Sequence, residues 1–205
     1  MTTTTQPGRT RAFALSWLSY ASYYLGRKGF SVVKVAIARE HGLATSTLAL
    51  IDSVYLVAYA SGQLPSGLAT DRLGARRVLA LGLFASAAAC AAFGASNNAA
   101  AFAVCFALNG LAQSTGWPAS TKVMAEWSEP HNRGRIMGVW GTCYQVGGIA
   151  ATALAAWALA RYGWRAAFQL PACWLAGMGG VVLLWLRERR VVSPSDAPQP
   201  TAADD

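Results

Sequence analysis

The chain of 205 residues is strongly apolar for its length, with 54% hydrophobic and only 13% charged residues. Soluble domains carry about 25% charged residues, so this deficit argues against a water-soluble fold. The net charge of +8 comes from short basic clusters between long uncharged runs. That placement argues against nucleic-acid binding, which needs a large polar surface with a continuous basic stripe.

Six apolar segments predict helices that cross a membrane, since about 20 apolar residues are enough to span the hydrocarbon core. Lipid requires every backbone hydrogen bond to be made internally, and barrel strands would alternate polar with apolar residues, so the segments are predicted as helices. The sequence therefore predicts an all-α integral membrane protein built as a six-transmembrane-helix bundle over residues 12–190. The expected helices cover residues 12–38, 43–70, 76–96, 99–123, 134–160 and 165–187.

The arginines in the connections and at the ends of these helices predict the orientation of the bundle in the membrane. With six crossings, ten arginines fall on one side and only Arg39, Arg161 and Arg165 on the other. The positive-inside rule then puts both termini in the cytoplasm of a protein of the plasma (inner) membrane. Residues 1–11 are expected to form a cytoplasmic tail. Residues 191–205 are rich in Pro, Ala and Asp, which predicts a disordered cytoplasmic tail or linker.

The first predicted helix carries basic residues where lipid is expected. Arg27 and Lys28 lie beyond its middle, and a lone basic group at that depth costs about 2.5–3.5 kcal/mol on insertion scales. Steps of four, three, four and three residues place a polar stripe on one helix face, formed by Tyr20, Tyr24, Arg27, Ser31 and Lys34. We interpret the stripe as the wall of a water-filled cavity in which Arg27 binds an anion, because a guanidinium stays charged and can hold two phosphate oxygens.

Some of these charges can also be accommodated without a ligand. Lys34 lies close to the outer end of the helix, so its ammonium can reach the membrane interface. Alternatively, Lys34 can pair with an acid. Asp52, near the start of the second helix, is interpreted mainly as a paired acid at the interface, with Lys34 or Arg39 as partner. Lys28 lies about 100° around the helix from Arg27 and would face either the cavity edge or a neighbouring helix.

The segment GLATDRLGARR, residues 67–77, is the most specific pattern in the chain. We expect Gly67 to let helices approach closely, Asp71 to end the second helix and Gly74 to allow a tight turn. An ordinary basic loop would explain the arginines but not the spacing of the Gly, Asp and Gly residues. The motif residues are Gly67, Asp71, Arg72, Gly74, Arg76 and Arg77.

This segment resembles the G-x-x-x-D-R-x-G-x-R-R loop of the major facilitator superfamily, where the loop braces the inward-closed state. Residues 20–30, YASYYLGRKGF, are similar to helix 1 of the organophosphate:phosphate antiporters, and residues 109–118, NGLAQSTGWP, to their helix 4. Residues 133–148 fit their helix 5. The resemblance runs from about residue 12 to 190 and implies the N-terminal half of a major-facilitator fold.

The resemblance also implies roles for individual residues. Arg27 would be half of a phosphate clamp whose second arginine comes from the other half, with Tyr20, Tyr24 and Lys28 lining the site. Two departures follow from the alignment with the glycerol-phosphate members, which carry a lysine at Gln63 and a histidine at Tyr144. Anion binding by this half is then expected to be weaker or tuned to another substrate. Gln63 and Tyr144 could still donate hydrogen bonds to a sugar or polyol, and Gln145 is a further polar residue expected at the site.

These patterns predict secondary transport of an organic anion, most plainly a phosphorylated metabolite exchanged for inorganic phosphate by alternating access. Transporters of this kind consist of two six-helix halves, so a complementary half or a second copy of the chain is expected as partner. The alternatives are a membrane sensor of sugar phosphates and a truncated fragment without transport activity. Nothing in the sequence suggests an enzyme, a cofactor or a metal site, since the four cysteines lie in apolar runs without CxxC spacing.

Overall fold

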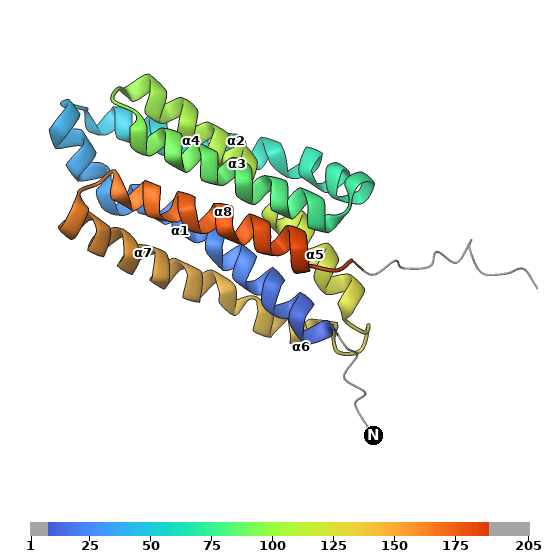
Figure 1. Cartoon of the computed structure of the whole chain (residues 1–205). Helices are drawn as coiled ribbons and strands as arrows, with labels where there is room; N and C mark the ends of the chain where they lie inside the picture. Colours follow the sequence, from blue (N-terminus) through green and yellow to red (C-terminus); the bar gives the residue numbers. More distant parts are fainter. Residues whose placement is uncertain (1–7, 189–205) are drawn as a thin grey trace, which may run out of the picture.

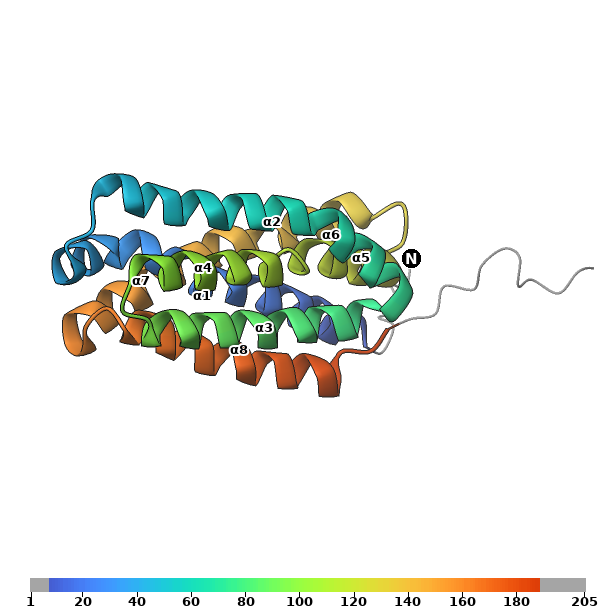
Figure 2. The ribbon, with the colours of Figure 1, turned by 90° about the horizontal axis from the view of Figure 1, so that it is seen from above.

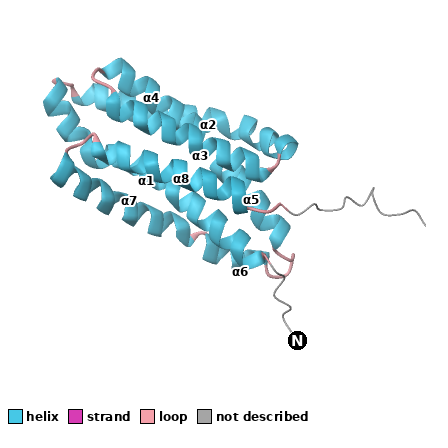
Figure 3. Cartoon of the chain, in the orientation of Figure 1, coloured by secondary structure: helices cyan, strands magenta, loops and turns pink. Residues whose placement is uncertain are grey.

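The computed structural model describes residues 8–188. This range is built from helices and short connections and contains no strand (Figures 1 and 3). Residues 1–7 and 189–205 lie outside the described residues; they include most of the expected N-terminal tail and the whole predicted tail at 191–205. Residues 9–11 of the expected N-terminal tail belong to the first helix. The helices are α1 Arg9–His41, α2 Thr45–Leu73, α3 Ala75–Ala95, α4 Ala99–Gln113, α5 Gly116–Trp127, α6 Arg133–Trp140, α7 Thr142–Tyr162 and α8 Ala166–Trp185.

Two of the six predicted spans are interrupted, which accounts for the eight helical segments. The span predicted at 99–123 is divided into α4 and α5, because Pro118 lacks an N–H group for the helical ladder. The hydroxyls of Ser114 and Thr115 donate instead to the carbonyls of Leu111 and Ala112, at 2.7 and 2.8 Å. The span predicted at 134–160 is divided only at Gly141, whose N–H still donates to the Met137 carbonyl.

The six spans differ in how clearly they match a membrane. Three are long and apolar enough by length and composition alone, namely Ala75–Ala95, Arg133–Tyr162 and Ala166–Trp185. The helices α1 and α2 have 33 and 29 residues, which at 1.5 Å per residue give about 50 and 44 Å. The whole is a six-transmembrane-helix bundle.

The helices run along one long axis, and α1 passes through the middle of the bundle (Figures 1 and 2). The first and last described residues lie at the same end, next to α5 and α6, as six crossings require. Indole N–H groups link α1 to its neighbours. Trp140 donates to Ser16 at 3.1 Å, and Trp174 donates to Ser22 at 2.9 Å.

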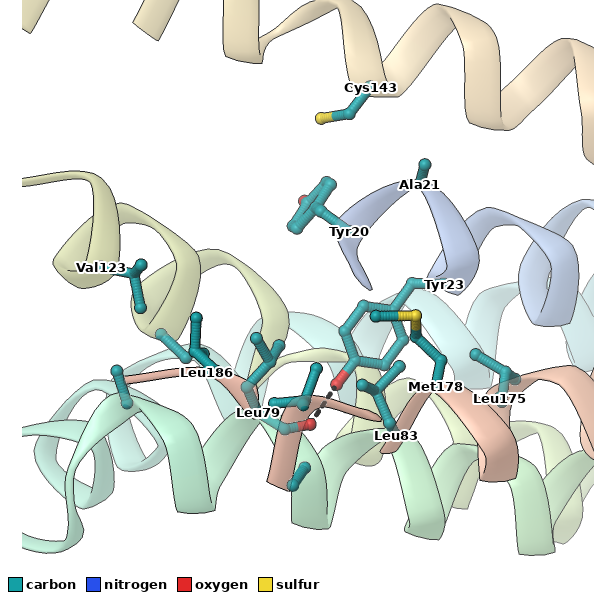
Figure 4. Close-up of a cluster of buried hydrophobic side chains, with 14 of the residues drawn as sticks. Tyr20, Ala21, Tyr23, Leu79, Leu83, Val123, Cys143, Leu175, Met178 and Leu186 are labelled. Carbon is teal, nitrogen blue, oxygen red and sulfur yellow. Dashed lines mark hydrogen bonds between the residues drawn. The ribbon is translucent and has the colours of Figure 1, made fainter. Parts of the chain in front are cut away.

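The interior is packed with apolar and aromatic side chains from α1, α3, α5, α7 and α8 (Figure 4). The buried Tyr23 hydroxyl points toward α3 and donates to the Leu79 carbonyl at 3.4 Å. On the other side of α1, Gly147 of α7 lies directly against the backbone, because a Cβ there would be 2.7 Å from the Ala21 carbonyl oxygen. Small residues at such crossings let membrane helices approach closely, and this contact sets the spacing of the two helices that form the cavity described next.

Candidate functional site

A cavity of about 720 Å³ lies between α1 and α7 and is open on one side. Its volume falls within the range of about 300–1,000 Å³ that is usual for small-molecule sites. Five of the seven predicted binding residues line it, including both adjacent basic residues. The lining consists of Tyr24, Arg27, Lys28, Tyr144, Gln145, Gly148, Ile149, Thr152, Ala153 and Ala156.

The half-buried guanidinium of Arg27 is surrounded by tyrosines. Its Cζ lies 5.0 Å from the ring centre of Tyr24 and 5.8 Å from that of Tyr59. Within residues 8–188 it forms no ion pair with an acid. The aromatic faces of Tyr24 and Tyr59 attract the cation without neutralising its charge, so that charge is left available to a ligand.

The side chain of Lys28 is exposed and lines the same cavity as Arg27, so it faces the cavity edge rather than a neighbouring helix. Lys34 takes no part in that lining. Its ammonium pairs with the Asp52 carboxylate at 3.2 Å, which confirms one of the two partners predicted for this acid. The two positive charges of the cavity are therefore Arg27 and Lys28.

Two predicted residues do not reach the cavity wall. Tyr20 is 7% exposed, and its ring centre lies 5.2 Å from that of Tyr144 and 6.2 Å from that of Tyr24, so it packs behind the wall. Gln63 is half-buried on α2, one turn beyond Tyr59, and is not among the lining residues.

The sequence analysis missed Tyr59, which approaches Arg27 from α2, and Tyr55, whose ring stacks on that of Tyr59 at 6.2 Å. A signal for them was present, because residues 55, 59 and 63 are spaced four apart and therefore share one helix face. The cavity residues Gly148 and Thr152 follow the same spacing on α7, and they were missed as well.

The segment of residues 67–77 joins three elements at the end of the bundle where α1 begins. The Asp71 carboxylate pairs with Lys122 of α5 at 3.1 Å, and the same ammonium donates to the Thr70 carbonyl at 3.2 Å. The turn falls at Gly74, with φ +89°, as expected. The Arg76 N–H donates to the carboxylate of Glu188 at 2.5 Å, which ties the start of α3 to the segment after α8.

Two expectations for this segment were wrong. Asp71 does not end the second helix. Instead, α2 continues to Leu73, with Asp71 and Arg72 in its last turn and Arg76 and Arg77 in the first turn of α3. Gly67 does not mediate a close helix contact, since a Cβ there would meet nothing within 4 Å. It lies instead in a groove between α2 and α5, where the described chain leaves open space.

The fold and the cavity define a polytopic membrane protein with a basic cavity on one side of a six-helix bundle. Residues 16–203 match the Major Facilitator Superfamily. The chain belongs to this superfamily and, by its relatives, to the organophosphate:phosphate antiporter family, of which it forms the N-terminal six-helix half.

Three relatives carry names of a membrane sensor and of transporters of organic phosphates. The chain is 33% identical to "Membrane sensor protein UhpC" of Escherichia coli, over 84% of this chain and 39% of that protein. It is 32% identical to "Sugar phosphate exchanger 3" of Xenopus laevis, over 85% and 41%. It is 33% identical to "Putative glycerol-3-phosphate transporter 2" of Arabidopsis thaliana, over 85% and 37%. The chain thus spans about two fifths of the length of these relatives.

A solved structure supports the fold. The chain superimposes with a TM-score of 0.82 and 16% identity on a bacterial homolog of the human lysosomal transporter Spinster, in an inward-facing and unoccupied conformation. The match covers 91% of this chain and 44% of the other. At this identity the likeness describes the arrangement of helices alone.

Proposed function

We propose that this chain supplies the anion-binding half of a secondary transporter that exchanges phosphorylated metabolites for inorganic phosphate. A second six-helix half completes the pathway, and rocking of the two halves exposes the cavity alternately to each side of the membrane. The names of the relatives support phosphorylated metabolites as the substrate class.

The observation that carries this proposal is the guanidinium of Arg27, which lies in an open cavity within a membrane bundle and pairs with no acid among residues 8–188. A phosphate monoester carries about −1.5 to −2 charges near pH 7. Arg27 and Lys28 together match that charge, and the planar guanidinium can hold two phosphate oxygens at once. On the other wall, Tyr144 and Gln145 provide hydrogen-bonding groups for a sugar or polyol.

A binding experiment tests the proposal directly. We would place the chain in lipid nanodiscs, alone and together with a complementary half, and measure binding of radiolabelled phosphate and glucose 6-phosphate. Arg27→Ala should abolish binding, and Arg27→Lys should weaken it, because an ammonium cannot make the bidentate contact. The matched control is Arg161→Ala, which removes an exposed arginine outside the cavity and should bind like the wild type.

Exchange is then measured in proteoliposomes loaded with phosphate that contain the chain and its complementary half. Uptake of labelled glucose 6-phosphate that depends on internal phosphate and on Arg27 supports the proposal. The proposal is overturned if no preparation binds phosphate above empty nanodiscs, or if Arg27→Ala binds as well as the wild type.

A sensor is the second candidate, because relatives of 33% and 31% identity carry the name membrane sensor protein. In that case the cavity would bind the same anion and pass the signal to a partner protein. Binding that depends on Arg27, together with no exchange in the complete proteoliposomes, would favour the sensor over the transporter.

A further inference from the structure

A second cavity, of about 460 Å³, lies where α1 begins, between the end of α5 and α6. It shares no lining residue with the cavity between α1 and α7. It lies at the end of the bundle where the described chain begins and ends (Figure 1), which the positive-inside rule assigns to the cytoplasm. The proposed function makes no use of this cavity, so its lining needs an explanation of its own.

The charged residues in the lining are two arginines from different helices, Arg9 of α1 and Arg135 of α6. Neither forms an ion pair with an acid in the described range, residues 8–188. The neighbouring Arg133 differs, because its guanidinium donates to the Ala125 carbonyl at 3.2 Å. Two guanidinium groups at one cavity favour an anionic ligand, and their geometry suits phosphate oxygens.

Two helix N-termini add positive potential at the same place. The helix α1 begins at Arg9, and α6 begins at Arg133, directly after the lining residue Asn132. Neither helix has a side-chain cap or an acidic residue in its first turn. The first N–H groups of a helix lack intrahelical partners and attract anions. The backbone and the arginines therefore favour the same kind of ligand.

The remaining lining is largely apolar, which favours a lipid over a soluble phosphate. Phe13 and Ile136 are half-buried, and Val139 is 55% exposed. Trp127 also lines the cavity, with its indole N–H donated to the Arg187 carbonyl at 3.2 Å. Tryptophan is enriched where a membrane meets water. Cations beside apolar walls match a phospholipid, which carries its phosphate next to its acyl chains.

An unused acceptor at the wall indicates a further feature of the ligand. The Oδ1 atom of Asn132 is buried, and no group within residues 8–188 donates to it. A buried acceptor without a donor is costly. A phosphate oxygen cannot donate, whereas a hydroxyl of the headgroup can. Phosphatidylglycerol combines a negative phosphate with hydroxyl donors and is therefore the probe of choice.

We propose that this cavity binds the headgroup of an anionic phospholipid, with Arg9 and Arg135 on its phosphate and Phe13 and Val139 against the upper part of its acyl chains. Basic pockets between membrane helices on the cytoplasmic side bind headgroups of this kind. A lipid bound there joins α1 to α5 and α6, so it should stabilise the folded chain. The inference is independent of the proposed function, because it concerns a different cavity.

Native mass spectrometry of the purified chain in detergent, titrated with dioleoyl phosphatidylglycerol, tests the proposal. The wild type should retain this lipid, and Arg9→Gln/Arg135→Gln should bind it about 10- to 100-fold more weakly. The matched control is Arg11→Gln/Arg187→Gln, which removes two exposed arginines at the same end but outside the lining. Its affinity should change less than about threefold, because exposed charges are screened.

Two further ligands separate the lipid from its parts. Dioleoyl phosphatidylethanolamine has the same acyl chains but no net charge and should bind more weakly than phosphatidylglycerol. Glycerophosphoglycerol, the headgroup without acyl chains, should not displace the lipid at equal concentration. Val139→Glu, at an exposed position, adds an acid to the lining and should also weaken phosphatidylglycerol binding.

Thermal unfolding provides a second readout and shows whether each variant is folded. Phosphatidylglycerol should raise the unfolding temperature of the wild type and of the control, but not that of Arg9→Gln/Arg135→Gln. The proposal is overturned if this variant binds the lipid as tightly as the control, or if phosphatidylethanolamine binds equally well. Displacement by glycerophosphoglycerol would overturn the lipid assignment and identify a site for a soluble phosphate instead.

Discussion

At the scale of single residues, the charges within the bundle fall into two kinds. Arg27 and Lys28 line an open cavity and pair with no acid among residues 8–188, whereas Lys34 is paired with Asp52. A cation in an open cavity that has no acid as partner is available to a ligand. A paired one is neutralised locally and contributes only modestly, since both side chains of that pair are 37% exposed.

This distinction predicts different effects for two substitutions. Asp52→Asn should change the free energy of unfolding by less than about 1 kcal/mol, as is usual for partly exposed ion pairs, and should leave phosphate affinity unchanged. Lys28→Ala should weaken phosphate binding with little effect on stability. Thermal unfolding and phosphate binding in nanodiscs measure both. A strong loss of affinity in Asp52→Asn would place the Lys34–Asp52 pair within the binding machinery, contrary to our assignment.

At the scale of elements, the turn between α2 and α3 depends on one backbone conformation. Gly74 has φ +89° and ψ +151°, a region that is essentially restricted to glycine. A Cβ there would also lie 2.6 Å from the Glu188 carboxylate, which accepts from the Arg76 N–H. A side chain at position 74 would therefore disturb both the turn and the hydrogen bond between Arg76 and Glu188.

Gly74→Ala should lower the free energy of unfolding by about 1–3 kcal/mol, the usual cost of such a strained conformation. Adding Glu188→Ala should recover only the part of this loss that comes from the clash. The control is Gly67→Ala in the same segment, where a Cβ meets nothing within 4 Å. It should be neutral or slightly stabilising, because alanine favours the helix. Equal losses in both glycine variants, measured by thermal unfolding, would show that the backbone conformation of Gly74 is not the cause.

The opposite end of the bundle contains a second charged cluster. The Glu40 carboxylate accepts from Arg165 and from the Trp164 indole, each at 2.7 Å, and Arg165 also donates to Asn97 at 2.7 Å. These bonds join the end of α1 to the connections before α8 and before α4. The hydrogen bond from Arg165, followed by that from Trp164, lowers the pKa of Glu40.

A lowered pKa means that the contribution of Glu40 to stability is present above its ordinary pKa of about 4.3 and is lost as the pH falls through the folded-state value. The unfolding temperature should therefore drop as the pH falls below about 4.3. Glu40→Gln should reduce the unfolding temperature at pH 7 and make the drop in acid shallower. Parallel pH curves for the variant and the wild type would show that other groups control the acid sensitivity.

The positions of the spans were predictable because lipid demands long apolar helices, a pattern that the sequence displays directly. The break between α4 and α5 was harder to predict, since it depends on how the hydroxyls of Ser114 and Thr115 satisfy the carbonyls near Pro118. The contacts of Tyr55 and Gln63 were not predictable from one helix. Both lie on the same stripe of α2 as Tyr59, and only the packing of α2 beside α1 brings Tyr59, but not Gln63, to the Arg27 site.

At the scale of the whole molecule, the described chain begins and ends at the same end of the bundle (Figure 1). That end also holds the connection between α2 and α3 and the one between α5 and α6, where basic residues gather. The positive-inside rule assigns it to the cytoplasm. This orientation is a prediction that labelling from one side of the membrane can test.

We expect Tyr162→Cys, at the exposed end of α7, to react with a membrane-impermeant maleimide applied to intact cells. Gly134→Cys lies near the start of α6, where a Cβ meets no atom within 4 Å, and should react only after the membrane is opened. The unsubstituted chain measures the background from its own cysteines, of which Cys90 and Cys143 are buried. Labelling of Gly134→Cys but not Tyr162→Cys in intact cells would show that the chain has the opposite orientation in the membrane. The cavity would then meet its anion from the other side.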